Sequence, residues 1–342
     1  MNAPIIRYTK AADDVDIGYG EFPGAGTPTV VVPKFGQLTV AGVHKVHSLV
    51  DFYNALRSGA PLFQFDFRGN GLSGALRGEP SVEQYTLDLA AVADVAGQTV
   101  DLVVFQGGCH AAARFAAEHP ERVRSLTMVC PLPNALQDSR FYGRVLKDDY
   151  EMGSILALRL AFDIAPDEPI NDLVAEFKRS YSKSTIKLLA DPRINHSVSI
   201  AEDLRRVEAP VLVVGPEDDR LWPEARETAA LLPAAAHWKT SVIPYNAAFG
   251  CAIRQRLDAL LEQLRPSPLQ PAPNGSKSNG VLSPREHDVL RLLAAGKTNG
   301  EIATVLCLST RTVERHARNI YTKLGIHNRV EASNWAREHG LT

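Results

Sequence analysis

Short apolar runs alternate with longer amphipathic stretches through the larger, N-terminal part of the chain. The apolar runs predict strands at 29–32, 62–65, 102–105, 125–129, 211–214 and 239–243. Between them, apolar residues recur at helical spacing at 46–56, 85–96 and 111–119. Strands that alternate with helices predict a parallel sheet with helices on both faces, which is an α/β fold.

The pattern changes after Leu264. Residues 265–280 are rich in Pro, Gly, Ser and Asn and have no apolar periodicity, which predicts a semi-extended linker. Beyond them only helical spacing remains. We therefore expect one domain at 1–264, a flexible linker at 265–280 and a small all-α domain at 281–342.

Several short helices are expected in the C-terminal domain, each with its own start or stop signal. Ser283 and Pro284 favour a helix start, and Gly296 favours its end. Asn299 and Ser309 are the expected N-caps of the next two helices. A last helix is expected at 330–339.

The helix expected at 310–324 has one apolar and one polar face. Its apolar positions are Val313, Ala317, Ile320 and Leu324, and its polar positions are Arg311, Glu314, Arg315, Arg318 and Asn319. A helix, a short turn and a second helix form the geometry in which the second helix reads base edges in DNA. The alternative is a small helical bundle whose charged face is only solvated.

Charge is distributed unevenly along the chain. From Lys277 onward there are 10 Lys and Arg against 6 Asp and Glu, whereas the rest of the chain has 27 against 33. The whole chain has a net charge of only −2, so it is no general binder of polyanions. The basic excess coincides with the predicted helix-turn-helix, as phosphate contact requires.

The spacing of the C-terminal segment resembles the LuxR-type helix-turn-helix family over residues 282–339. The matching residues are Leu282-Ser283-Pro284-Arg285-Glu286, Val289-Leu290, Gly296, Asn299, Glu301-Ile302-Ala303, Ser309, Thr312-Val313, His316, Ile320, Lys323-Leu324, Asn328-Arg329 and Ala332. The resemblance implies a transcription regulator that binds double-stranded promoter DNA at a roughly palindromic site as a homodimer. RNA polymerase is a further implied partner.

The same resemblance implies roles for individual residues. The helix at 310–324 would be the recognition helix, with Glu314, Arg315 and Arg318 facing bases. Thr312, Lys323, Asn299 and Arg329 would lie near phosphates, and Arg311 and Asn319 belong to the same DNA-facing set. His316 is expected inside the domain. The helix at 330–339 resembles the family's dimerisation helix, with Trp335 as a contact.

The N-terminal landmarks resemble the α/β-hydrolase fold over roughly 15–264. Asp66-Phe67-Arg68-Gly69-Asn70-Gly71-Leu72-Ser73 resembles that fold's D-x-R-G-x-G-x-S turn, and 111–123 resembles its nucleophile-bearing helix and exit. Residues 211–223 match the strand and loop that carry the acid. The resemblance implies a mostly parallel sheet, with a helical lid at about 132–208.

The catalytic residues of such a hydrolase are missing at three separate positions. The nucleophile position falls on Gln106, whose amide is no nucleophile, although Asp219 stands at the acid position. The loop 244–249 contains no histidine. The loop after Val32 lacks the histidine-glycine pair that helps build an oxyanion hole. Without a general base, serine-type acyl transfer has no proton acceptor.

Cys109 and His110 suggest a thiol hydrolase instead, with Cys109 at the turn. Adjacent side chains on a helix point about 100° apart, so His110 is a poor base for Cys109. Placing Cys109 at the turn would also leave too short a helix before His119. We therefore expect Cys109 to be a packing residue and His119 to cap that helix.

The chain shows no signal for a cofactor, a metal site or a membrane segment. Its four cysteines, Cys109, Cys130, Cys251 and Cys307, have no paired spacing, which favours reduced thiols in a cytoplasmic protein. No apolar run reaches the roughly 18 residues of a transmembrane helix.

The favoured hypothesis is a regulator whose degenerate hydrolase pocket senses a small molecule without cleaving it. The expected lining residues are Phe35, Gln106, Gly107, Asp219, Trp222 and Tyr245. The alternative is an active hydrolase, with Cys109 as its candidate nucleophile, fused to a DNA-binding domain. A third hypothesis gives the large domain only a role in dimerisation and docking.

Overall fold

The computed structural model describes residues 4–34, 39–134, 155, 170–180, 199–217, 223–232, 235–240, 246–264, 282, 284–306, 310–339 and 341. Most of the lid expected at about 132–208 lies outside these residues. Within it the structure describes α7 (Asn171–Ser180) and α10 (Ala201–Arg206).

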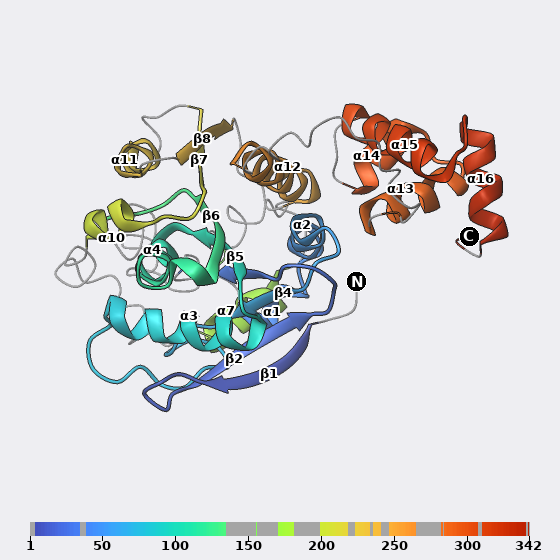
Figure 1. The fold of residues 1–342 in the computed structure, drawn as a ribbon. Helices are drawn as coiled ribbons and strands as arrows, with labels where there is room; N and C mark the ends of the chain where they lie inside the picture. Colours follow the sequence, from blue (N-terminus) through green and yellow to red (C-terminus); the bar gives the residue numbers. More distant parts are fainter. Residues whose placement is uncertain are drawn as a thin grey trace.

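The described strands form one sheet of eight strands in the order β1-β2-β4-β3-β5-β6-β7-β8 (Figure 1). Their bounds are β1 Ile5–Lys10, β2 Asp16–Phe22, β3 Thr29–Val32, β4 Leu62–Phe65, β5 Val100–Phe105, β6 Val123–Val129, β7 Val211–Pro216 and β8 Ala235–Thr240. From β4 to β8 every pair of neighbours is parallel, whereas β2 is antiparallel to both β1 and β4. The predicted mostly parallel α/β sheet is confirmed.

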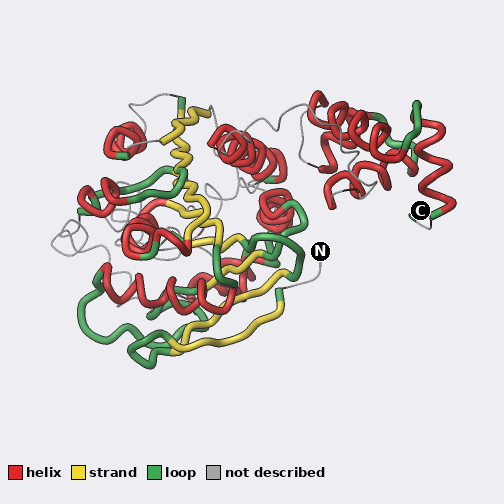
Figure 2. The backbone as a smooth tube through the Cα atoms, in the orientation of Figure 1, coloured by secondary structure: helices red, strands yellow, loops and turns green. Residues whose placement is uncertain are grey.

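Helices cover both faces of this sheet (Figure 2). One face packs against α3 (Val82–Ala96), α4 (Cys109–Glu118), α10 and α11 (Pro223–Leu231). The other packs against α1 (Val40–Val43), α2 (His47–Arg57), α7 and α12 (Ala247–Leu264). Alternate strand residues enter the two cores: Val30 and Val32 lie in the first, and Val31 lies in the second. Burial on both faces explains why the central strands are continuous apolar runs.

The edges of the sheet differ from the sequence predictions. The hairpin of β1 and β2 is not predicted, because most of β1 is exposed and shows no alternation of burial. In β2, Gly18 leaves room for Leu72: a Cβ atom on Gly18 would lie 2.6 Å from the Leu72 Cβ. β8 begins four residues earlier than the predicted strand, and 241–243 lie outside the described residues.

The C-terminal part contains α13 (Pro284–Ala294), α14 (Asn299–Leu306), α15 (Thr310–Leu324) and α16 (Arg329–Glu338). Their shared core includes Val289, Leu290, Ile302, Val313, Ala317, Ile320, Ala332 and Ala336. Gly296 follows α13 with φ +80°, a conformation that favours glycine after a helix.

The N-cap predicted for α14 is wrong by one residue. Thr298, not Asn299, caps this helix: its hydroxyl accepts from the Glu301 amide at 3.2 Å. The Glu301 carboxylate in turn accepts from the Thr298 amide at 2.7 Å, which completes a capping box. Ser283 and Ser309, the other predicted caps, lie outside the described residues.

The expectation of reduced thiols is corrected at one position. Cys251, on α12, is disulfide-bonded, and its partner lies outside the described residues. Cys109 and Cys130 are free and buried. None of the described helices combines the length and apolarity needed to cross a membrane.

A buried ion-pair cluster anchors the turn after β4. Arg68 donates to Asp88 on α3, with an Nη2–Oδ1 distance of 2.7 Å, and to Asp13 with an Nη2–Oδ1 distance of 2.9 Å. Asp88 also accepts from the Arg68 backbone amide at 2.9 Å. Burial raises the pKa of Asp88, and the bonds from Arg68 oppose that shift. The cluster ties the β1–β2 turn and α3 to the centre of the sheet.

We predict that Asp88→Ala lowers the free energy of unfolding by about 3 kcal/mol, because it leaves the buried Arg68 with one carboxylate fewer. Asp94→Ala, on the same helix, is the control: its side chain is 64% exposed in its pair with Arg122. The control should cost less than about 1 kcal/mol. Urea denaturation of both variants measures the difference, and equal losses would contradict the structural role of the cluster.

Candidate ligand pocket and DNA-reading face

The chain makes a strained turn at the carboxyl end of β5. β5 ends at Phe105, and Gln106 follows with φ +46°, a conformation that is unusual for any residue except glycine. A 3-10 turn over Gln106–Gly108 leads into α4, which begins at Cys109. This strand-turn-helix geometry is that of a nucleophile elbow. The structure therefore confirms that Gln106, and not Cys109, occupies the turn.

Close packing of the backbone holds this turn in place. A Cβ atom on Gly108 would lie 2.4 Å from the carbonyl oxygen of Pro33, in the loop after β3. Only glycine allows that approach without a shift of one of the two segments. A strained φ costs of order 1–3 kcal/mol and persists only where the surrounding structure fixes it.

The structure places only some of the predicted ligand-lining residues. Gln106 is partly exposed at the elbow, and Gly107 is buried beside it. Phe35, Asp219, Trp222 and Tyr245 lie outside the described residues. Lys34, a residue that no sequence pattern marks, is 7% exposed directly after Pro33. Its long charged side chain gave no sequence signal of burial, because lysine is usually exposed.

Cys109 and His110 are both packed inside the N-terminal part. Burial raises the pKa of the Cys109 thiol to about 12. The His110 Nε2 atom lies 2.7 Å from the carbonyl oxygen of Leu132. His119 is the C-cap residue of α4, as predicted. The geometry thus gives Cys109 the environment of a packing residue.

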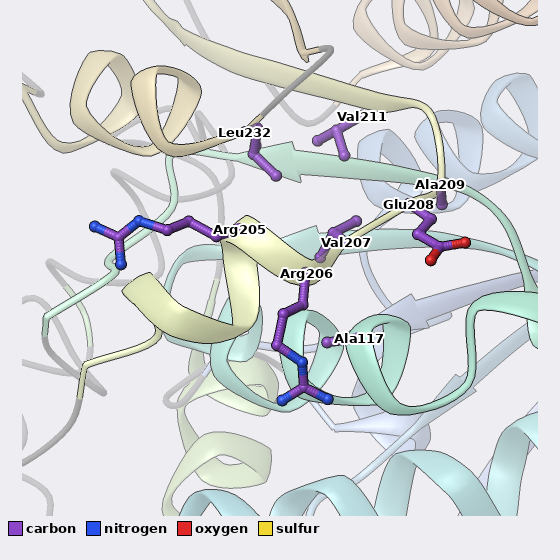
Figure 3. Close-up of a pocket in the computed structure, with 8 residues that line it drawn as sticks. All are labelled: Ala117, Arg205, Arg206, Val207, Glu208, Ala209, Val211 and Leu232. Atoms are coloured by element: carbon purple, nitrogen blue, oxygen red, sulfur yellow. The ribbon is translucent and has the colours of Figure 1, made fainter.

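A surface pocket of about 560 Å³ lies elsewhere in the domain (Figure 3). It is lined by Ala117, Arg205, Arg206, Val207, Glu208, Ala209, Val211 and Leu232. Arg205 and Arg206 extend away from the apolar residues Val211 and Leu232 (Figure 3). Val211 is the first residue of β7, so this pocket opens where the parallel strands begin. Gln106 lies at the opposite end of the strands, where β5 ends. No group of three or more His, Cys, Asp or Glu residues within the described ranges could hold a metal ion.

The predicted DNA-facing residues lie on α15 and at its borders. Glu314, Arg315, Arg318 and Asn319 are exposed, while Val313, Ala317 and Ile320 are buried on the opposite face. The side chains of Arg311 and Thr312 lie outside the described residues. Asn299 is partly buried in the first turn of α14. His316 is partly buried. α15 therefore presents a continuous polar face that includes two arginines.

Two of the predicted phosphate contacts also make contacts within the domain. The Lys323 ammonium donates to the buried Glu286 carboxylate of α13 at 2.7 Å. Arg329 donates to the backbone carbonyl of Lys297. These bonds fix both side chains at the ends of the helices that carry them.

Several known proteins are similar to this chain in sequence. The family model of bacterial regulatory proteins of the luxR family matches residues 280–336. The Fimbriae Z protein of Salmonella typhimurium is 46% identical over 69 residues, 20% of this chain and 33% of the relative. The transcriptional regulatory protein LiaR of Bacillus subtilis is 30% identical over 187 residues, 54% of this chain and 81% of the relative. The chain spans 29–38% of the length of the first curated relatives that it matches.

The N-terminal part is similar to solved hydrolase structures. The bromoperoxidase of Bacillus anthracis superposes with a TM-score of 0.58 at 17% identity, over 75% of this chain and all of the other. At that identity the likeness shows the fold, and the fold is that of the α/β hydrolases. The chain belongs to the luxR family of bacterial regulatory proteins and has an α/β-hydrolase fold in its N-terminal part.

Proposed function

We propose that the N-terminal domain binds a small molecule at the elbow and that binding controls how the C-terminal domain engages DNA. The observation that carries this proposal is the turn at Gln106. It has the backbone of a nucleophile elbow, with an amide where a nucleophile would stand. An amide donates and accepts hydrogen bonds, so the position is suited to hold a polar group and not to attack it.

The residues around Gln106 set the expected ligand chemistry. Gly107 offers a backbone amide at the start of the helix, and Phe35, Asp219, Trp222 and Tyr245 are the proposed remaining lining. Such a set combines aromatic surface with a few polar groups, as small-molecule pockets do.

The proposed output is promoter binding by a dimer. The proposed unit boundaries are 1–264 for the sensor, 265–280 for the linker and 281–342 for the DNA-binding domain. Glu314, Arg315 and Arg318 would contact bases. Two copies would bind a roughly palindromic site in the cytoplasm, where RNA polymerase is a further partner. A ligand can shift this equilibrium only by binding one arrangement more tightly than the other.

We predict that Gln106→Leu abolishes the response to the ligand, because leucine keeps the size of the side chain and removes its hydrogen bonds. A panel of esters, lactones and small acids is screened by thermal shift and by DNA titration. Gln98→Leu, at an exposed position, is the control. The absence of any response to the panel in the wild-type chain would contradict sensing and leave a constitutive regulator.

An active thiol hydrolase is the competing function, and the state of Cys109 tests it. With a pKa of about 12, roughly one thiol in ten thousand or fewer is ionised near pH 7.5. We therefore predict that iodoacetamide leaves Cys109 unmodified in the folded protein and labels it after denaturation, as mass spectrometry would show. Fast labelling of the folded protein, with turnover of p-nitrophenyl esters that Cys109→Ala abolishes, would instead establish the enzyme.

For the DNA-reading face, we predict that Arg318→Ala and Arg315→Ala each weaken specific binding by about 1–3 kcal/mol, the usual loss for a base contact. The site is first selected from a random DNA pool and then measured in gel shifts at fixed salt. Arg77→Ala, at an exposed position in the N-terminal part, removes the same charge outside the C-terminal helices. Equal losses in all three variants would argue for a nonspecific charge effect and against base reading.

A further inference from the structure

The side chain of Gln64 is buried between the sheet and the helices that cover it, yet its amide is unpaired. Gln64 lies within β4 and is 1% exposed. Neither its Nε2 nor its Oε1 atom has a hydrogen-bond partner within the described part of the chain. Buried amides normally have such partners, because taking an amide out of water without them costs free energy. Gln64 therefore needs a source of hydrogen bonds that these residues do not supply.

The neighbouring strands offer this amide no side chain to bond. Gln64 is level with Gly20 on β2 and with Val31 on β3. Gly20 has no side chain, and that of Val31 is apolar. Asp66, two residues further along the chain, accepts from two backbone amides at 3.0 Å, one of them that of Val40. Among these neighbours, the side chains are thus either apolar or bonded to other groups.

The helices α1 and α7 cover this side of the sheet (Figure 1). Gln64 points to the same face as Leu62, two residues before it, and Leu62 shares a core with Val43 of α1 and Val174 of α7. α1 packs against α7 and against β2, the strand next to β4. The unpaired amide therefore lies in an apolar layer beneath these two helices.

Gln64 is distant from the elbow at Gln106. Val31 is level with both Gln64 and Val103, and Val103 precedes Gln106 by three residues on the chain. The two glutamines are therefore about 10 Å apart along the strands and about 10 Å apart across two strand spacings. A small molecule held at one of them does not occupy the other.

The two unpaired atoms define the chemistry of a matching guest. Oε1 accepts hydrogen bonds and Nε2 donates them, so the guest must present a donor and an acceptor side by side. A carboxamide or a lactam does so while it is neutral. An ester or a ketone has acceptors only and satisfies half of Gln64. An ionised carboxylate also only accepts, and it would lose its hydration in this apolar layer.

We propose that Gln64 is the binding residue of a second site, which takes a neutral carboxamide or lactam group on a small apolar body. The N–H of the guest donates to Oε1, and its carbonyl oxygen accepts from Nε2. The apolar body packs among the side chains around Leu62 and Val43. The inference goes beyond the proposed sensing function and does not rest on it, because the site needs neither Gln106 nor DNA.

Butyramide and pentan-2-one test the proposal in the full chain, because they differ only in an amino or a methyl group on the same carbonyl. The ¹⁵N-labelled side-chain amide of Gln64 is identified in NMR spectra as the signal that Gln64→Leu removes. Butyramide should shift this signal in a saturable way. It should also bind the wild-type chain about tenfold more tightly than pentan-2-one, because the ketone forms one hydrogen bond fewer.

Thr127→Val is the matched control for Gln64→Leu. Thr127, on β6, is level with Val103 on the same face, is 0% exposed and also has an unpaired polar atom. Gln64→Leu should weaken butyramide binding about tenfold, whereas Thr127→Val should bind it like the wild type. Both variants should unfold at the same temperature as the wild type or higher, because each loses an unpaired buried polar group.

The proposal is overturned if butyramide leaves the Gln64 signal unshifted, as it would if a water that butyramide cannot displace held this amide. Equal affinities of the wild-type chain for the two probes would also overturn it, and this comparison requires no variant. Equal losses of butyramide binding in Gln64→Leu and Thr127→Val would contradict a specific site. Because the readout is binding at Gln64 and not DNA binding, failure here is distinguishable from failure of sensing at Gln106.

Discussion

The approach of Gly108 to the carbonyl oxygen of Pro33 is the contact on which the candidate pocket depends. It brings the end of β5 against the loop after β3 and leaves Gln106 at positive φ. The same contact sets the first turn of α4 and places Lys34 close to the elbow. Burial on both faces of β3 and β5 supplies the packing energy that holds this arrangement.

This arrangement separates the geometry of a hydrolase from its chemistry. Acyl transfer requires a nucleophile and a base that act on a transition state. Binding requires only a shaped cavity with a few placed polar groups. A chain can therefore lose a first set of residues, the catalytic ones, and keep a second set, those that shape the cavity. The elbow backbone is fixed by glycine and strand packing and not by the catalytic side chains. The proposed sensing function requires only this second set of residues.

Much of the fold could be predicted from the sequence, because buried parallel strands and capped helices leave strong local patterns. The strands from Thr29 to Val214 and the elbow at Gln106 were placed correctly. The hairpin of β1 and β2 was missed because an edge strand exposed on both faces has no alternation. Thr298 was missed as a cap because Asn299, its neighbour, is an equally good capping residue in isolation.

The rest of the site depends on contacts between distant segments. The burial of Lys34 follows from the packing of its loop, and the pairing of Arg124 with Asp101 follows from the neighbouring positions of β6 and β5 in the sheet. No local sequence pattern predicts either of these contacts. The expectation of reduced thiols failed at Cys251 for the same reason, since disulfide formation depends on distance in space and not on spacing in sequence.

A crystal structure of the full chain with a responsive ligand from the panel tests the proposed sensing function most directly. We expect an intact ligand between the sheet and the lid, with a polar atom within hydrogen-bond distance of the Gln106 amide. A cleaved product, a covalent adduct on Cys109, or a ligand bound away from an elbow filled by side chains would contradict it.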